Sequence, residues 1–155
     1  MAIEIEITWQ EPQHYFYLKN TELPPNNGFL YKEVSYSRNK FTLLSIGHSF
    51  AKKVDLTNNN RHFQEPLLNF RSSHPNRLYL ISIGIIDSPI KLTKAQLIEL
   101  ETLEVMAHPR SKFPHLINNK FLHKYSMPNY YTVYNSGFKL DKMVSKITYD
   151  FEVFP

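Results

Sequence analysis

Four groups of residues along the chain carry side chains that could act together in chemistry. Tyr31 ends the tripeptide Phe29-Leu30-Tyr31, and Ser45 begins the tripeptide Ser45-Ile46-Gly47, which His48 follows. A basic stretch comes next, and Glu101 lies much farther along the chain. A phenol, basic side chains and a distant carboxylate, in this order, can assemble a site that cuts phosphodiester bonds. The basic stretch contains Lys52, Lys53, Arg61 and His62.

Two strands must position the first two groups. Residues 29–36 and 40–46 are rich in aromatic, leucine and β-branched side chains, which is typical of strands. The three residues between them suit a short hairpin loop whose last residue is left-handed. If the hairpin closes directly at this loop, Tyr31 faces Ser45 on the neighbouring strand.

The elements that follow the hairpin alternate between helix and strand. The pattern at 48–54 predicts a short helix, and a second helix is expected at 61–70, starting near Glu65 or kinked there because proline follows. The apolar run at 78–86 predicts a central strand that is covered on both faces. The clearest helix is at 93–107, where a Thr-x-x-Gln capping box precedes an apolar pattern.

These elements predict an α+β fold: a small three-stranded mixed or antiparallel sheet flanked by helices, in the order strand, strand, helix, helix, strand, helix. We expect one domain over 1–155, with this core at 28–118. The segment 1–27 contains an alternating strand and is expected to be an addition to the core. The segment 119–155 is expected to be a C-terminal extension with strands at 130–134 and 147–154.

Composition limits the classes of function. The chain has 155 residues, a formal net charge of +4 and 14% aromatic residues, and the positive charge is concentrated between Lys32 and Arg77. That distribution favours a polyanionic partner. The absence of cysteine excludes disulfides, thiolate metal sites and a cysteine nucleophile. The first residues do not resemble a signal peptide, and no apolar run could span a bilayer, so a cytoplasmic protein with no membrane partner is expected.

The order of the chemistry-bearing residues resembles the GIY-YIG nuclease family, which is named for two tripeptides on adjacent strands. Phe29-Leu30-Tyr31 is similar to the first tripeptide, in a form that keeps only the tyrosine. Ser45-Ile46-Gly47 is similar to the second, with serine where the family usually has tyrosine. The resemblance covers about residues 28–118, ending with Leu100-Glu101 and Asn118 in the family's order.

The resemblance implies hydrolysis of DNA phosphodiester bonds with one divalent metal ion. Tyr31 would be the general base, with a pKa lowered by neighbouring cations. Arg61, or Lys52 or Lys53 in its place, would bind the scissile phosphate, and Glu101 would hold Mg²⁺ or Mn²⁺. The other residues that the resemblance places at the site are Ser45 and His48, near the reacting groups, and Lys52, Lys53, His62 and Asn118, at the nucleic acid.

Ordinary structural roles compete with these assignments. Tyr31 could be a core tyrosine, and Arg61 could lie in a solvated turn. The helix at 93–107 is apolar nearly all round, so Glu99, Glu101 and Glu104 all have apolar neighbours. Periodicity does not choose among the three acids, and only the resemblance selects Glu101.

Three functions follow from these observations. The first is a metal-dependent DNA endonuclease, of the restriction or genome-defence type, with a homodimer as one way to cut both strands. The second is a nucleic-acid-binding module, for DNA or RNA, that has lost catalysis; Ser45 in place of tyrosine favours it. The third is a protein-interaction domain, suggested by the aromatic tail.

Overall fold

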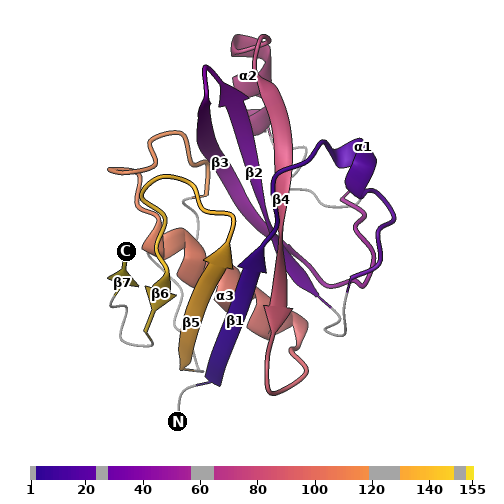
Figure 1. The fold of residues 1–155 in the computed structure, drawn as a ribbon, viewed down its shortest axis with the longest axis vertical. Helices are drawn as coiled ribbons and strands as arrows, with labels where there is room; N and C mark the ends of the chain where they lie inside the picture. Colours follow the sequence, from indigo (N-terminus) through magenta and orange to yellow (C-terminus); the bar gives the residue numbers. More distant parts are fainter. Residues whose placement is uncertain (1–2, 24–27, 57–64, 119–129, 149–152) are drawn as a thin grey trace.

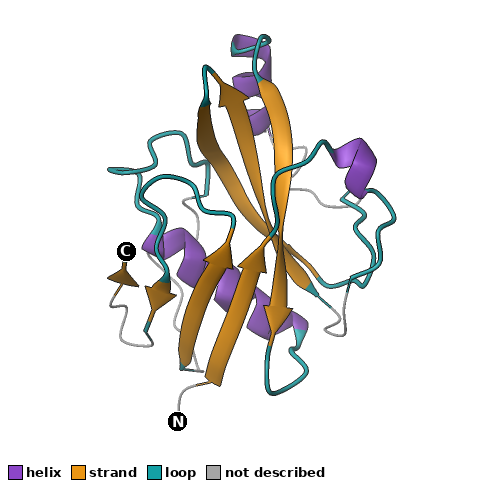
Figure 2. Cartoon of the chain, in the orientation of Figure 1, coloured by secondary structure: helices purple, strands orange, loops and turns teal. Residues whose placement is uncertain are grey.

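A single mixed β-sheet organises the computed structural model, which describes residues 3–23, 28–56, 65–118, 130–148 and 153–155 (Figure 1). Strands make up most of it, and few helices accompany them (Figure 2). The sheet has seven strands in the order β3-β2-β4-β1-β5-β6-β7 and curls into a half-barrel. The strands are β1 (Ile3–Trp9), β2 (Phe29–Ser37), β3 (Lys40–Ser49), β4 (Leu78–Asp87), β5 (Tyr131–Gly137), β6 (Lys146–Ile147) and β7 (Val153–Phe154), and the helices are α1 (Tyr15–Leu18), α2 (Glu65–Ser73) and α3 (Lys94–Ala107).

The expected three-stranded sheet flanked by helices is therefore wrong. Strand β1 is not an addition at the edge: it lies in the middle of the sheet, antiparallel to β4 and parallel to β5. The C-terminal segment continues the same sheet through β5, β6 and β7. The alternating isoleucines of β1 explain why this strand lies inside the sheet and not beside it: Ile5 and Ile7 are fully buried and need a covered sheet face.

The β2–β3 hairpin forms where the sequence predicts it, but its register differs. The turn contains only Arg38 and Asn39, both with positive φ (51° and 60°), and Ser37 pairs with Lys40. Positive φ at both central residues is the type I′ geometry that matches the twist of a hairpin. A bulge next to Glu33 shifts the pairing again. As a result, Tyr31 pairs with Gly47 rather than with Ser45.

The helix expected at 48–54 does not form. Strand β3 continues to Ser49, and the backbone of Lys52 and Val54 then bonds to the segment before β2, through Leu23 N to Lys52 O (2.8 Å) and Val54 N to Thr21 O (3.0 Å). Val54 is fully buried in this extended segment. Tertiary pairing thus replaces the helical bonds that the local pattern favoured.

Other local predictions are confirmed. Helix α2 occupies Glu65–Ser73, the earlier part of its expected range, 61–64, lies outside the described residues, and β4 lies between β2 and β1 in the middle of the sheet. Helix α3 begins after the Thr93 cap, with reciprocal bonds between Thr93 and Gln96, and ends at Ala107. Within the part of the chain that is described, no helix has the length and apolar character needed to cross a bilayer.

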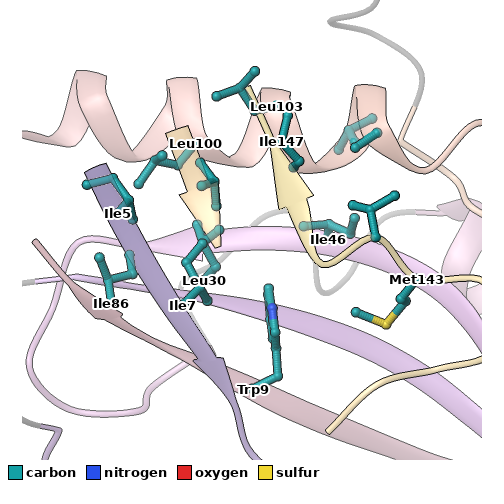
Figure 3. Packing of buried hydrophobic residues seen from close by; sticks show 14 of the residues in the cluster. Ile5, Ile7, Trp9, Leu30, Ile46, Ile86, Leu100, Leu103, Met143 and Ile147 are labelled. Atoms are coloured by element: carbon teal, nitrogen blue, oxygen red, sulfur yellow. The ribbon is translucent and has the colours of Figure 1, made fainter. Parts of the chain in front are cut away.

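Two apolar clusters lie on opposite faces of the sheet. The larger one packs under α3, and Figure 3 shows side chains of this helix meeting others from β1, β2, β3 and β6. Its members include Ile7, Leu30 and Leu100, which are fully buried. The smaller cluster lies on the other face and contains Phe29, Tyr31 and residues from β4 and the segment after β3. The side chains of β2 alternate between the two clusters, as a strand requires.

Candidate functional site

Tyr31 lies in the smaller apolar cluster, and no part of its side chain is exposed. Its ring covers Gly47, because a Cβ atom built on Gly47 would come within 2.8 Å of the Tyr31 Cε1 atom. On the same face, the Ser45 hydroxyl donates to the Glu33 carboxylate (3.2 Å), and both residues are buried. Tyr31, Ser45 and Glu33 thus share one face of the hairpin. Glu33 is not among the site residues predicted from the sequence, although its spacing of two positions from Tyr31 along the strand places both side chains on that face.

Glu101 lies on the opposite face. Its carboxylate approaches the His48 ring at 3.4 Å (Oε2 to Nδ1), and the Glu101 side chain is fully buried. His48 pairs with Leu30, which belongs to the cluster under α3. The sheet itself therefore separates His48 and Glu101 from Tyr31 and Ser45. The phenol and the carboxylate of the predicted site do not converge.

The remaining predicted residues are dispersed. The Asn118 side chain binds the backbone of β3, accepting from Ile46 N (2.8 Å) and donating to Ile46 O (2.7 Å), so it continues the edge of the sheet as a strand would. Lys52 and Lys53 are exposed, and Lys53 lies 4.0 Å from Glu22. Arg61 and His62 lie outside the described residues.

All three acids of α3 that the sequence could not distinguish are buried, and each has a different partner. Glu99 accepts a hydrogen bond from the Tyr131 hydroxyl, and Glu101 approaches His48. Glu104 lies near Lys32 and His108. The described residues contain no group of three or more His, Asp or Glu side chains that could share a metal ion.

Lys32, Glu104 and His108 form a buried charge cluster beneath α3. The Lys32 ammonium lies 3.8 Å from the centroid of the Trp9 ring and is 1% exposed, while Glu104 and His108 are fully buried. Burial lowers the pKa of Lys32 to about 8, although the charge of Glu104 opposes the shift. Burial also raises the pKa of Glu104, against the charge of Lys32 and a hydrogen bond from Asn135.

His108 is neutral at pH 7 in this cluster. Burial, with a smaller contribution from the Lys32 charge, lowers its pKa to about 3, against the bond to the Glu104 carbonyl. Its Nδ1 atom lies 2.6 Å from that carbonyl, so Nδ1 carries the proton and donates. A closed apolar environment with these groups favours a structural role for the cluster.

A different set of charges lies in the open, around the tip of the β2–β3 hairpin. Two cavities adjoin there and share Lys40 and Thr42 of β3. One, which we call the Phe41 cavity, measures about 440 Å³, and the other, the Arg77 cavity, about 470 Å³. Among the residues that the structure describes, their combined lining contains a single acid, Asp141. We call the basic residues of this lining the cationic surface: Arg38, Lys40, Arg77, Lys112, Lys139 and Lys142.

Four segments far apart in the sequence build the cationic surface, and Arg77 comes from the one just before β4. The hairpin supplies Arg38 and Lys40, the loop after α3 supplies Lys112, and the loop after β5 supplies Lys139 and Lys142. Both loops lie next to β3 in Figure 1, where they are orange and amber. Arg77 is oriented by contacts of its guanidinium with the hydroxyls of Ser35 (3.3 Å) and Thr42 (3.4 Å).

Sequence reasoning did not single out this surface. The basic charge between Lys32 and Arg77 is visible in the sequence, but three lysines of this surface lie beyond it: Lys112 in the expected core, and Lys139 and Lys142 in the expected C-terminal extension. Isolated lysines in loops carry no periodic signal. Only the neighbouring positions of the two loops and the hairpin bring these charges together.

Comparison of the chain with protein-family models, with curated proteins and with solved structures gives no match.

Proposed function

We propose that the chain is a nucleic-acid-binding protein and that the cationic surface binds the phosphate backbone. The observation that carries the proposal is the concentration of six Lys and Arg side chains around two adjoining cavities whose described lining contains one acid. Nucleic-acid backbones are recognised by such clusters, since each neutralised phosphate releases counterions. DNA is the partner to test first, and RNA presents the same phosphate charge.

The hairpin turn supports this assignment. Arg38 occupies a left-handed backbone conformation (φ 51°), which residues other than glycine and asparagine adopt less readily. The turn holds Arg38 at the tip of the hairpin, at the rim of the Arg77 cavity. The type I′ turn thus places a cation at this cavity, where it can contact a phosphate.

Binding without cleavage agrees better with the geometry than hydrolysis does. Hydrolysis by the residues that the sequence suggested requires the Tyr31 phenol and the Glu101 carboxylate to reach one phosphate. The two side chains are completely buried on opposite faces of the sheet. We therefore assign the basic residues to binding and give Tyr31 and Glu101 no catalytic step.

The test is a salt titration of DNA binding with charge-matched variants. Lys112→Gln/Lys142→Gln removes two cations from the cationic surface. We expect weaker binding and a slope of log affinity against log salt that is shallower by about 1.4 on single strands and about 1.8 on duplexes. Fluorescence anisotropy with labelled DNA between ~50 and ~200 mM salt measures both quantities.

Two control variants make the test specific. Lys91→Gln/Lys94→Gln removes the same charge from exposed positions at the start of α3, at the other end of β4 from the hairpin tip (Figure 1). Lys52→Gln/Lys53→Gln tests the surface that the sequence suggested. Equal losses in all three double variants would contradict a localised site. A parallel incubation of the wild type with plasmid DNA and Mg²⁺ or Mn²⁺ tests cleavage, and nicking that Tyr31→Phe abolishes would contradict the assignment.

A further inference from the structure

The Phe41 cavity combines two kinds of surface that phosphate binding alone does not require. Its floor is apolar, since Leu43, Phe113 and Leu140 line it and are nearly buried. Its rim carries Lys40, Lys112, Lys139 and Lys142. A volume of about 440 Å³ falls in the range of small-molecule sites, roughly 300–1,000 Å³. The cavity is thus suited to a compact ligand with an apolar part and a negative part.

Aromatic rings stand beside this floor. Phe41 and Phe138 both line the cavity, are half-buried, and meet edge to face with their centroids 5.1 Å apart. Tyr36 packs against the other side of Phe41 at 4.7 Å between centroids. The rings are therefore held in place by their neighbours, and a flat ligand can stack on them with little loss of side-chain freedom.

We propose that the Phe41 cavity receives an unpaired base of a single-stranded nucleic acid, while the lysines of the rim hold the flanking phosphates. This inference rests on the proposed function and specifies its substrate class. Aromatic platforms combined with a basic groove are how proteins bind single strands without sequence preference. A duplex offers phosphates to the rim but keeps its bases stacked inside, so it leaves the apolar floor unused unless a base is flipped at an energetic cost.

The charge pattern agrees with this occupant. Among the described residues Asp141 is the single acid of the lining, and the four lysines come from β3, the loop after α3 and the loop after β5. A neutral apolar ligand would use the floor and leave these lysines without a counter-charge. A nucleotide uses both.

The experiment compares three DNA ligands at one salt concentration: a short oligothymidine, an abasic strand of equal length, and a duplex of equal length. The abasic strand keeps the phosphates and removes the bases. We expect oligothymidine to bind roughly 5- to 150-fold more tightly than the abasic strand, the ratio typical of stacking one base on an aromatic side chain. This comparison uses the unmodified protein.

A substitution locates the effect. Phe138→Leu keeps an apolar side chain in the cavity and removes the ring, so it should reduce the ratio of oligothymidine to abasic affinity. Phe16→Leu is the matched control, because Phe16 is 75% exposed on α1 and lines neither cavity. Phe16→Leu should leave that ratio unchanged.

The outcomes separate this inference from the proposed function. Equal affinity for oligothymidine and the abasic strand, with salt-dependent binding of both, would overturn the base-binding inference and leave phosphate binding in place. A ratio that Phe138→Leu does not change would also overturn it, since the base would then lie elsewhere. Failure to bind any of the three ligands would overturn both proposals.

Discussion

Charged side chains occur in two contrasting regions of this molecule. In the buried charge cluster, Lys32, Glu104 and His108 are at most 1% exposed, and their pKa values are displaced by burial. On the cationic surface, the side chains of Lys112, Lys139 and Lys142 are exposed and surround open cavities. The first region contains chemically unusual groups that a ligand cannot reach, whereas the second contains ordinary groups that it can.

The contrast teaches that a perturbed pKa is not enough to identify a functional site. Desolvation shifts the pKa of any buried titratable group, including one whose role is structural. Binding of a polyanion instead needs several accessible cations on one surface. The two regions should therefore respond to substitution in opposite ways, with stability changing in the first and affinity in the second.

The largest effect is expected from Lys32→Met. Glu104 would remain buried without its cation, and we expect the free energy of unfolding at pH 7 to fall by about 3 kcal/mol or more. The double variant Lys32→Met/Glu104→Gln removes both charges and should recover part of this loss. Urea unfolding of the wild type and both variants measures it. A double variant no more stable than the single one would show that the pair is not coupled.

Acidification tests His108. Its pKa is about 3 in the folded chain and about 6.5 when unfolded, so below pH 6.5 the unfolded chain binds a proton that the folded chain does not. Stability should then fall by about 1.4 kcal/mol per pH unit between pH 6.5 and 3. The raised pKa of Glu104 acts in the opposite direction, because the folded chain keeps that proton longer; Lys32 is charged in both states here and adds no slope.

The variant His108→Gln isolates this contribution. It keeps a donor near the Glu104 carbonyl but cannot be protonated, so the acid loss should disappear and the Glu104 contribution should remain. Urea unfolding at pH 6 and pH 4 provides the comparison. An acid loss of the same size in His108→Gln would assign it to other groups.

A third substitution asks whether Tyr31 belongs to the structural interior. Gly47→Ala places a methyl group against the Tyr31 ring, which lies in a packed cluster, and overpacking of this kind typically costs about 1–3 kcal/mol. Thermal unfolding measures the loss, and Gly47→Ala combined with Tyr31→Leu should recover part of it. Nucleic-acid affinity of the folded fraction should not change. Loss of affinity in proportion to loss of packing would connect this face to binding.

The smallest effect on stability is expected at the cationic surface. Lys112→Gln/Lys142→Gln changes exposed side chains, so the free energy of unfolding should stay within about 0.5 kcal/mol of the wild-type value. The same variant is expected to lose affinity for DNA. A stability loss above about 1 kcal/mol would mean that these lysines support the fold and that the two regions are not separable.

Elements with strong local signals could be predicted from the sequence. The capping box at Thr93 and the apolar run of β4 specified α3 and a central strand, because each signal is contained within the element itself. The hairpin was also predictable, but its register was not, since a two-residue turn and a bulge moved Gly47 opposite Tyr31. The segment after β3 pairs with residues near Thr21, and no local pattern reports such pairing.

The candidate site was predicted less well than the fold. An order of residues along the chain does not specify the face of the sheet to which each side chain points. Adjacent positions of a strand point to opposite faces of the sheet, and helix α3 covers one face only. Tyr31 points to the other face, so the sheet separates it from Glu101 of α3. The three buried acids of α3 show the same limit: their burial is visible in the apolar pattern, but their partners are not.

The sequence by itself determined the charge balance, the absence of cysteine chemistry, the β2–β3 hairpin and the boundaries of α3, because composition and short-range pattern are properties of the chain alone. Only the tertiary structure decided that β1 lies at the centre of the sheet, that the phenol and the carboxylate point apart, and that lysines from two distant loops meet beside Lys40. These features depend on which strands pair and which loops become neighbours. That pairing is selected by burial of the whole core, so no single segment encodes it.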